Sequence, residues 1–203
     1  IGEAHSCHGK VDALMIAQRE GHEKWRRTSR AGLQGDEPFA RNHPVPEDFT
    51  VGGLAMRIYI HTDLEGISGI DRGEMVPRDS EDYRRSCELL MGDLNAAVDG
   101  AFAGGATEVI VLDSHGGGNN FIVDLLDSRA QHDLKPNKKW WGILDERCDA
   151  TYFIGAHAMA GTMNAFLDHT QSSLAWFNYS INGRKMGELA QWALVAGHFG
   201  VPL

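Results

Sequence analysis

From Met56 onward, short apolar runs alternate with longer amphipathic ones, and this alternation restricts the folds that the chain can adopt. RIYIH (57–61) is short, β-branched and aromatic, which indicates a strand. Residues 80–105 place apolar side chains three and four positions apart, which predicts a helix with one buried face. TEVIVLD (107–113) and DATYFIG (149–155) indicate two further strands. This order predicts an α/β domain with a largely parallel sheet flanked by helices.

Local signals mark several ends and turns within this pattern. Ser80 is a candidate N-cap for the first helix, and Gly104–Gly105 is a candidate stop. LAWFNYSI (174–181) followed by Asn182–Gly183 predicts a β-hairpin. A final helix is expected within GELAQWALVAGHFG, residues 187–200.

The first 55 residues differ in character from the remainder. They hold three of the six prolines, at positions 38, 44 and 46, and show little apolar periodicity. We therefore expect residues 1–55 to be a flexible N-terminal extension and residues 56–203 to be the catalytic domain. Because the chain stops at GVPL (200–203), where a new strand is expected to start, we expect this domain to be truncated at its C-terminus.

Composition excludes some classes of partner. A net charge of -9 argues against nucleic acid as a partner, since its recognition begins with a basic surface. No run reaches the roughly 20 apolar residues that a membrane-spanning helix needs, so no membrane partner is expected. Three scattered cysteines form no disulfide framework, and the first residues resemble no secretory signal. The expected location is the cytoplasm.

Each predicted strand leads into potential metal ligands at its carboxyl end. Asp63 and Glu65 follow the first strand, Asp113 and His115 the second, and His157 the third. Ligands of open α/β sheets bind outside these strand ends, so these side chains are expected to converge there. Oxygen and imidazole donors suit zinc, manganese or cobalt. Asp63 could bridge two such ions, which together activate water and polarise a carbonyl.

Each of these residues also has an ordinary explanation when it is taken alone. An Asp-x-Glu pair in a turn is usually solvated, and a histidine after a strand is more often structural. Glu188 at a helix start is favoured by the helix dipole in any case, and His169 lies in a loop where it needs no role. On spacing alone, the interpretation goes no further than a metal-dependent hydrolase or phosphoesterase.

Five ordered segments resemble one known family, the zinc-dependent D-aminopeptidases associated with bacterial dipeptide transport operons. They are MRIYIHTDLEGISG, TEVIVLDSHGGGNN, YFIGAHAMAGT, DHTQSS and INGRKMGELA. The resemblance covers nearly all of residues 56–203. It departs from the family pattern in the added N-terminal extension and in the absence of the C-terminal portion.

The resemblance implies a dinuclear site with two zinc ions per chain and His169 as the catalytic nucleophile or base. Its implied ligands are Asp63 (bridging), Glu65, His115, His157 and Glu188. It also implies a homo-oligomeric zinc metallopeptidase that removes the N-terminal residue, a D-amino acid in the family, from short peptides. The alternatives are a phosphoesterase or amidohydrolase using the same ions, and a non-catalytic binding fragment in which GGGNN (116–120) holds a phosphate.

Overall fold

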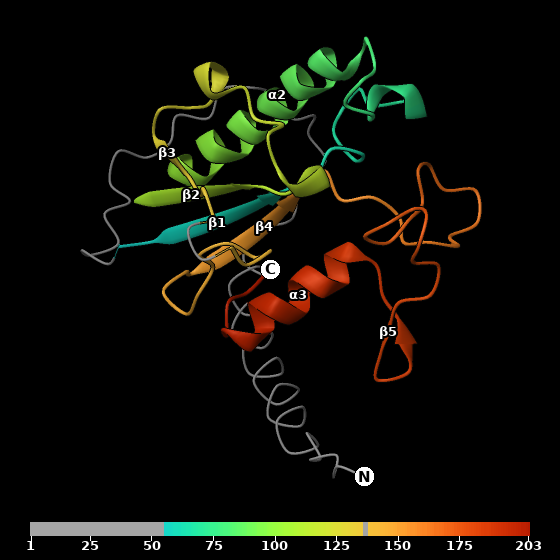
Figure 1. Ribbon diagram of the computed structural model, residues 1–203. Coiled ribbons are helices and arrows are strands. Elements are labelled where there is room, and N and C mark those ends of the chain that lie inside the picture. The colour runs from blue at the N-terminus through green and yellow to red at the C-terminus, as the bar shows by residue number, and fades with distance from the viewer. Residues whose placement is uncertain (1–54, 136–137) are drawn as a thin grey trace, which may run out of the picture. The chain divides into compact units, whose positions relative to one another are not determined.

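The computed structural model describes residues 55–135 and 138–203, and within them a four-stranded parallel sheet (Figure 1). Its strands are β1 (Arg57–Thr62), β2 (Glu108–Asp113), β3 (Ala130–His132) and β4 (Ala150–Ile154), in the spatial order β3-β2-β1-β4. All three pairings are parallel. The prediction of an α/β domain with a largely parallel sheet is confirmed. The expected extension, residues 1–55, lies outside the described residues except for Ala55.

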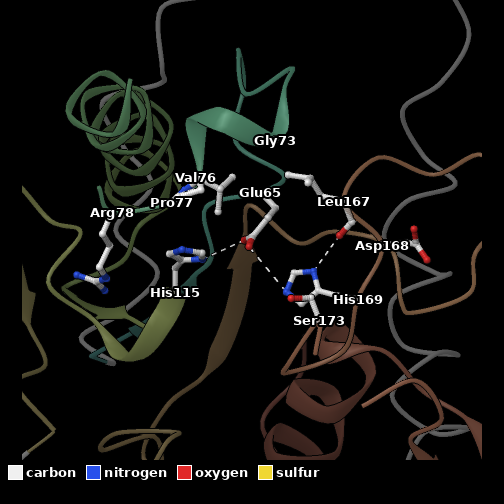
Figure 2. A pocket seen from close by; sticks show the side chains of 10 residues that line it. All are labelled: Glu65, Gly73, Val76, Pro77, Arg78, His115, Leu167, Asp168, His169 and Ser173. Carbon is white, nitrogen blue, oxygen red and sulfur yellow. Dashed lines mark hydrogen bonds and ion pairs between the residues drawn. The ribbon is translucent and has the colours of Figure 1, made fainter. Parts of the chain in front are cut away.

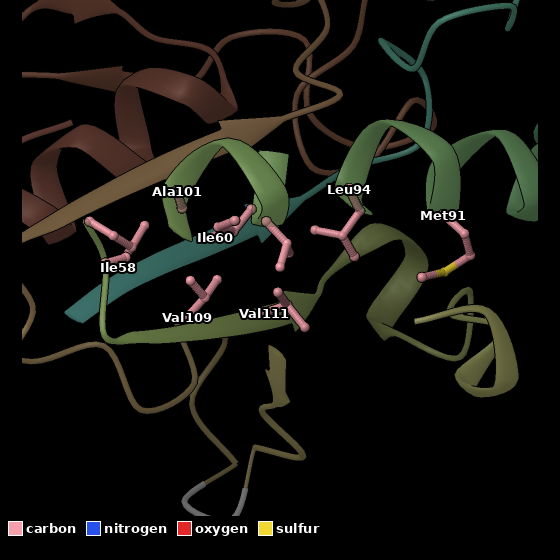
Figure 3. Close-up of a cluster of buried hydrophobic side chains, with 9 residues drawn as sticks. Ile58, Ile60, Met91, Leu94, Ala101, Val109 and Val111 are labelled. Atoms are coloured by element: carbon pink, nitrogen blue, oxygen red, sulfur yellow. The ribbon is translucent and has the colours of Figure 1, made fainter. Parts of the chain in front are cut away.

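One long helix covers each face of the sheet (Figure 1). Helix α2 (Tyr83–Ala103) packs Met91, Leu94 and Val98 against one face, and Figure 3 shows Met91 and Leu94 in this cluster. Helix α3 (Glu188–His198) packs Trp192 and Ala196 against the other face. The three-residue spacings that predicted α2 therefore correspond to the side chains that it buries.

Strand β1 has buried side chains on both of its faces because successive side chains point to opposite sides. Ile58 and Ile60 join the core beneath α2, whereas Tyr59 joins the core beneath α3. The ring of Tyr59 stacks on that of Trp192 at 5.8 Å between centroids. Since β1 lies between β2 and β4, its carboxyl end is flanked by the carboxyl ends of two other strands.

Three local details differ from the sequence-based expectations or refine them. Strand β3 was not predicted, because Ala-Gln-His is too short and polar to stand out. Ser80 is not the N-cap: α2 begins at Tyr83 with Asp82 as its N-cap, and the Ser80 hydroxyl accepts a bond from the Asp82 amide. The hairpin is present, although its strands are only β5 (Ser180–Ile181) and β6 (Arg184–Lys185), and residues 174–179 are not in a strand.

The hairpin turn follows the expected chemistry. Asn182 and Gly183 have φ values of 51° and 75°. A two-residue turn with both φ angles positive suits Asn-Gly and matches the twist of the paired strands. Elsewhere the described residues form three short 3₁₀ helices: η1 (Gly73–Met75), η2 (His115–Gly117) and η3 (Val123–Leu125). In the part of the chain that the structure describes, no helix combines the length and apolarity needed to cross a membrane.

Candidate metal centre

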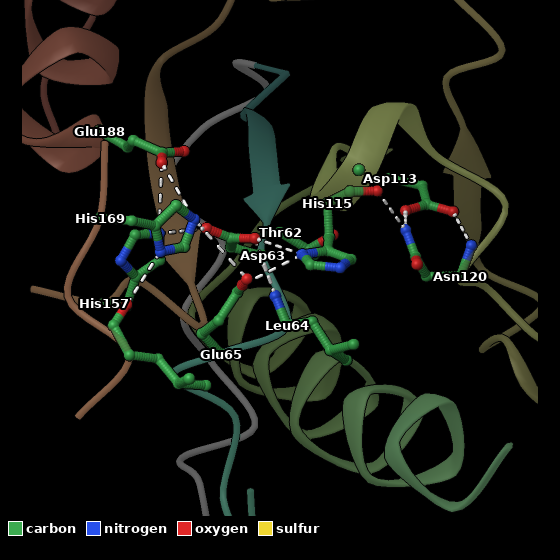
Figure 4. Close-up of polar contacts among 12 residues, drawn as sticks. Thr62, Asp63, Leu64, Glu65, Asp113, His115, Asn120, His157, His169 and Glu188 are labelled. Carbon is green, nitrogen blue, oxygen red and sulfur yellow. Dashed lines mark hydrogen bonds and ion pairs between the residues drawn. The ribbon is translucent and has the colours of Figure 1, made fainter. Parts of the chain in front are cut away.

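The carboxyl edge of the sheet gathers the acidic and imidazole side chains into one cluster (Figure 4). Asp63 and Glu65 follow β1, His115 follows β2, and His157 follows β4. Glu188 is the first residue of α3. The segments that carry these residues are far apart in sequence, so the cluster depends on the parallel order of the strands.

Asp63 lies at the centre of the cluster and faces a different imidazole with each oxygen. Its Oδ1 lies 3.2 Å from Nδ1 of His115, and its Oδ2 lies 3.3 Å from Nε2 of His157. Glu65 joins the first side, with Oε2 3.0 Å from Nδ1 of His115. Glu188 joins the second side, with Oε1 3.3 Å from Nε2 of His157. The five predicted ligands therefore form two groups that share Asp63.

Two glycines allow the ends of β1 and β4 to approach closely enough for this arrangement. A Cβ on Gly66 would lie 2.2 Å from the Ala156 carbonyl oxygen, and one on Gly155 would lie 2.1 Å from that of Asp63. Gly155 also has a φ of 81°, which disfavours other residues. Two hydrogen bonds hold these strand ends together: the Asp63 amide donates to the Ile154 carbonyl, and the Gly66 amide donates to the Gly155 carbonyl.

The electrostatics of the cluster favour charged groups despite their burial. Burial alone lowers the pKa of His115 and His157, but their bonds to carboxylates outweigh it and raise these pKa values to about 9 and about 10. Asp63 shows the converse balance. Burial raises its pKa, and the two imidazoles beside it lower it well below its usual range.

The donor atoms of the cluster fit a metal ion better than a set of side chains whose hydrogen bonds are all satisfied. Oδ2 of Asp63 and Nε2 of His157 are both buried, and neither has a hydrogen-bond partner within the described residues. They face each other at 3.3 Å without hydrogen-bond geometry. Unpaired buried polar atoms are costly, and a cation between them would satisfy both. The cluster is made of oxygen and nitrogen donors, which suits zinc.

Backbone carbonyls orient two of the histidines. Nδ1 of His157 lies 2.9 Å from the Ala158 carbonyl oxygen, and Nδ1 of His169 lies 2.8 Å from that of Leu167. A carbonyl can only accept, so Nδ1 of each ring carries a proton, and in the neutral imidazole the lone pair is on Nε2. The lone pairs are thus presented to the cluster, as metal ligation or proton acceptance requires.

His169, like Glu188, is a predicted site residue to which no strand leads, and the structure brings it to the cluster. Its ring stacks on that of His157 with 3.9 Å between centroids. Its Nε2 lies 3.7 Å from Oε1 of Glu188 and 3.8 Å from Oε1 of Glu65. These distances exceed those within the two ligand groups, and the His169 side chain is 19% exposed. His169 therefore borders the cluster and remains accessible.

The loop that carries His115 is held by Asp113, which the sequence offered as a potential metal ligand, and by Asn120, which it did not single out. The Asp113 carboxylate accepts bonds from the Asn120 amide and side chain, both at 2.6 Å, and from the Phe121 amide at 3.1 Å. Asn120 also donates to the His115 carbonyl and accepts from the Tyr83 hydroxyl. These donors are therefore already occupied by a carboxylate, which argues against a phosphate cradle in GGGNN.

Two cavities open beside the cluster. The first has a volume of about 430 Å³ and is lined by Glu65, His115 and His169 together with Arg78 and apolar side chains, as Figure 2 shows. The second has a volume of about 460 Å³ and is also lined by Glu65, His115 and His169, to which it adds Asp63, Glu188 and Lys135. Arg78 and Lys135 were not predicted as site residues, because nothing in the local sequence links them to the strand ends.

Comparison with known proteins identifies the family of the chain. The family described as D-aminopeptidase matches residues 56–203. A D-aminopeptidase of Bacillus subtilis (strain 168) is 34% identical over 151 residues, which are 73% of this chain and 54% of that protein. The solved structure of the Zn-dependent D-aminopeptidase DppA from Bacillus subtilis, described as a self-compartmentalizing protease, superposes with a TM-score of 0.68 at 34% identity.

The aligned part of that structure again covers 73% of this chain and 54% of the other. This chain thus spans about half the length of the relatives it matches. The family match begins at Met56, where the strand–helix alternation begins, and includes every residue of the cluster. The chain belongs to the D-aminopeptidase family.

Proposed function

We propose that residues 56–203 form the catalytic domain of a dinuclear zinc aminopeptidase. The observation that carries the proposal is the position of Asp63, which directs one oxygen toward His115 and the other toward His157. A carboxylate placed in this way suits a bridging ligand between two ions. The Zn-dependence of the similar Bacillus protein supports zinc over manganese or cobalt.

In this proposal the ligands form two groups that share Asp63, and each group would hold one ion. One group adds Glu65 and His115, and the other adds His157 and Glu188. Two zinc ions would supply Lewis acidity and an activated water next to the peptide carbonyl. Oδ2 of Asp63 and Nε2 of His157 have no hydrogen-bond partner among the described residues, which supports a metal ion in the group that contains His157.

His169 is proposed as the residue that accepts and returns a proton. Its Nδ1 is tied to the Leu167 carbonyl, which leaves Nε2 free to take a proton from the attacking water. The nitrogen can then pass that proton to the leaving amine. The other assignment is ligation, because Nε2 of His169 can group with donor atoms of His157 and Glu188 within 4.8 Å. The longer distances from its Nε2 to the carboxylates of Glu65 and Glu188 favour the proton-transfer role.

The proposed substrate is a short peptide with a D-amino acid at its N-terminus, and the proposed assembly is a homo-oligomer. Both follow from the similar Bacillus protein, a D-aminopeptidase described as self-compartmentalizing. Cavities of about 430 and 460 Å³ beside the cluster have the size of small-ligand sites. They suit a short peptide better than an extended chain.

The test combines metal content with turnover on the same sample. The full chain, purified without added metal, is expected to contain about two zinc ions and to release D-alanine from D-alanyl-D-alanine. Asp63→Asn should lose both ions and the activity, whereas the exposed control Asp79→Asn should keep them. Two ions retained in Asp63→Asn would overturn the bridging role. A folded, zinc-supplied protein that binds no metal would overturn the proposed function.

A further inference from the structure

The first cavity carries a positive charge beside the proposed centre. Figure 2 shows Glu65 and His169 in the middle of this cavity, with Arg78 on one side and Asp168 on the other. Val76, Pro77 and Leu167 supply apolar surface. A molecule in this cavity would therefore contact the cluster and a guanidinium at the same time.

Arg78 is held in place by backbone carbonyls and not by a carboxylate. Its Nη2 donates to the carbonyl oxygens of Gly116 and Gly118, and its guanidinium lies 5.8 Å from the centroid of the Tyr83 ring. Within residues 55–135 and 138–203 it makes no ion pair. Its neighbours in sequence differ, since Arg72 pairs with Asp82 and Arg84 with Glu88.

This arrangement positions the Arg78 guanidinium to bind an anion. Both carbonyl contacts use one terminal nitrogen, so the other donors of the planar group have no hydrogen-bond partner among the described residues. The guanidinium is already fixed by those contacts, so little conformational entropy is lost when it binds a ligand. An arginine binds carboxylates in a two-pronged geometry that favours them over neutral groups.

We propose that Arg78 binds the free carboxylate of the amino acid that leaves on hydrolysis, and so selects substrates with a carboxylate next to the scissile bond. This inference rests on the proposed function, because it assumes that a peptide carbonyl lies at the centre. With the carboxylate on Arg78, the scissile bond lies toward Glu65 and His169 (Figure 2). The substrate amine then points toward the side of Asp168, whose charge is opposite to that of Arg78.

Lys135 in the second cavity is the competing cation. It lies on the other side of the His115 loop, where its Nζ would be 3.9 Å from a Cβ on Gly118. Both cavities are lined by Glu65, His115 and His169, so we favour Arg78 because its guanidinium is fixed by carbonyl bonds. A lysine at the end of a flexible chain gives weaker geometric selection.

The experiment compares an acid with its amide. Hydrolysis of D-alanyl-D-alanine and of D-alanyl-D-alaninamide is measured for the zinc-loaded full chain and for Arg78→Met, with Arg84→Met and Lys135→Met as matched charge-removing variants. Kd values for both compounds are measured in parallel by calorimetry in the His169→Ala background, where turnover is expected to be slow. We expect the parent protein to prefer the acid by about 10- to 100-fold, the size of a charge-assisted bond.

Arg78→Met should lose this preference, because only the binding and hydrolysis of the acid become weaker. Arg84→Met should retain the preference. An equal loss on both compounds would mean that Arg78 only supports the Gly116–Gly118 backbone, and would overturn the inference. Loss of the preference in Lys135→Met instead would also overturn it. Equal Kd values for acid and amide, with turnover intact, would overturn it and leave the proposed function standing. An acid preference in Kd without any turnover would overturn the proposed function and leave the carboxylate site standing.

Discussion

The two loops that bring histidines to the centre are held in contrasting ways. The His115 loop, residues 114–120, is closed by buried hydrogen bonds over a short stretch of chain. Asp113 and Asn120 are 4% and 0% exposed, and the Asp113 carboxylate accepts three bonds from the far end of the loop. The position of His115 is thus set by its own sequence neighbours and by Tyr83 of α2.

The His169 loop, residues 159–179, is longer and presents large apolar side chains to solvent. Leu174 is 98% exposed, Met163 88% and Phe177 66%. His169 is held by its backbone bond to the Ala158 carbonyl and its ring bond to the Leu167 carbonyl. Within residues 159–179 only Ala160 and Thr170 are buried, so this loop is expected to open locally at lower free energy than the core.

This contrast indicates that the two loops have different roles, one in metal binding and the other in turnover. The His115 loop, called the braced loop below, carries a proposed ligand, whose position must be maintained for the metal to bind. The exposed loop carries the proposed proton-transfer residue, which has to meet the substrate. Substitutions in the first should therefore change metal affinity, and those in the second should change turnover with the metal retained.

The largest expected effect tests the exposed loop. His169→Ala should lower kcat by about 10²- to 10⁴-fold, the range for a general acid–base residue, while the zinc content stays the same. Steady-state kinetics and elemental analysis of one preparation measure both. His198→Ala, at the far end of α3, serves as control. If zinc falls together with kcat, His169 is a ligand and the division of roles between the loops is wrong.

The next effect tests the braced loop. Asn120→Ala removes bonds to Asp113 and to the His115 carbonyl, so zinc affinity should fall by about 10- to 100-fold, the range for residues that orient ligands. Chelator competition measures that affinity. Asn119→Gly is the matched control, because Asn119 is exposed and has a φ of 69°, which glycine tolerates. Unchanged affinity in Asn120→Ala would mean that the bracing does not position His115.

A smaller effect is expected from pH, through Tyr83. Burial raises the pKa of Tyr83 from 10.0 to about 12, so the folded protein favours the neutral phenol that donates to Asn120. This contribution to the free energy of unfolding is complete below pH 10 and is lost as the pH rises from 10 toward 12. Tyr83→Phe lacks it at every pH. The stability difference between the two proteins, measured in urea, should therefore shrink above pH 10; a constant difference would contradict this.

The smallest effect concerns the apolar surface of the exposed loop. Leu174→Ser should change the free energy of unfolding by less than about 0.5 kcal/mol, since the side chain is almost fully exposed. Leu94→Ala, which truncates a fully buried side chain of α2, should cost about 2–5 kcal/mol. A large loss for Leu174→Ser would show that the exposed loop is packed, and would remove the contrast with the braced one.

Much of the fold could be predicted because its signals are local. The strands β1, β2 and β4 are apolar runs, and α2 repeats apolar residues at the spacing of a helix. The Asn182–Gly183 turn is determined by the tolerance of these two residues for positive φ. Strand β3 was missed because three residues of mixed polarity carry no periodic signal, and only pairing with β2 defines them as a strand.

The candidate site could be predicted only in part. Asp63, Glu65, His115 and His157 follow apolar strands, so their meeting at one edge follows from a parallel sheet. Glu188 and His169 were assigned through the family resemblance, because no strand leads to them. Asp113 follows a strand in the same way as Asp63, yet its carboxylate bonds to Asn120 and Phe121 and lies apart from the ligand groups (Figure 4).

The amino-acid sequence by itself therefore determined the α/β class, the strand ends at which ligands gather, and the family. These are properties of neighbouring residues, read from periodicity and ordered motifs. The tertiary structure decided which carboxylate faces the imidazoles and which supports a loop, how His169 reaches Glu65 and Glu188, and that Arg78 lies beside them. The physical reason is that contacts of 3–4 Å between distant segments depend on strand order and close backbone approach. No local pattern encodes either.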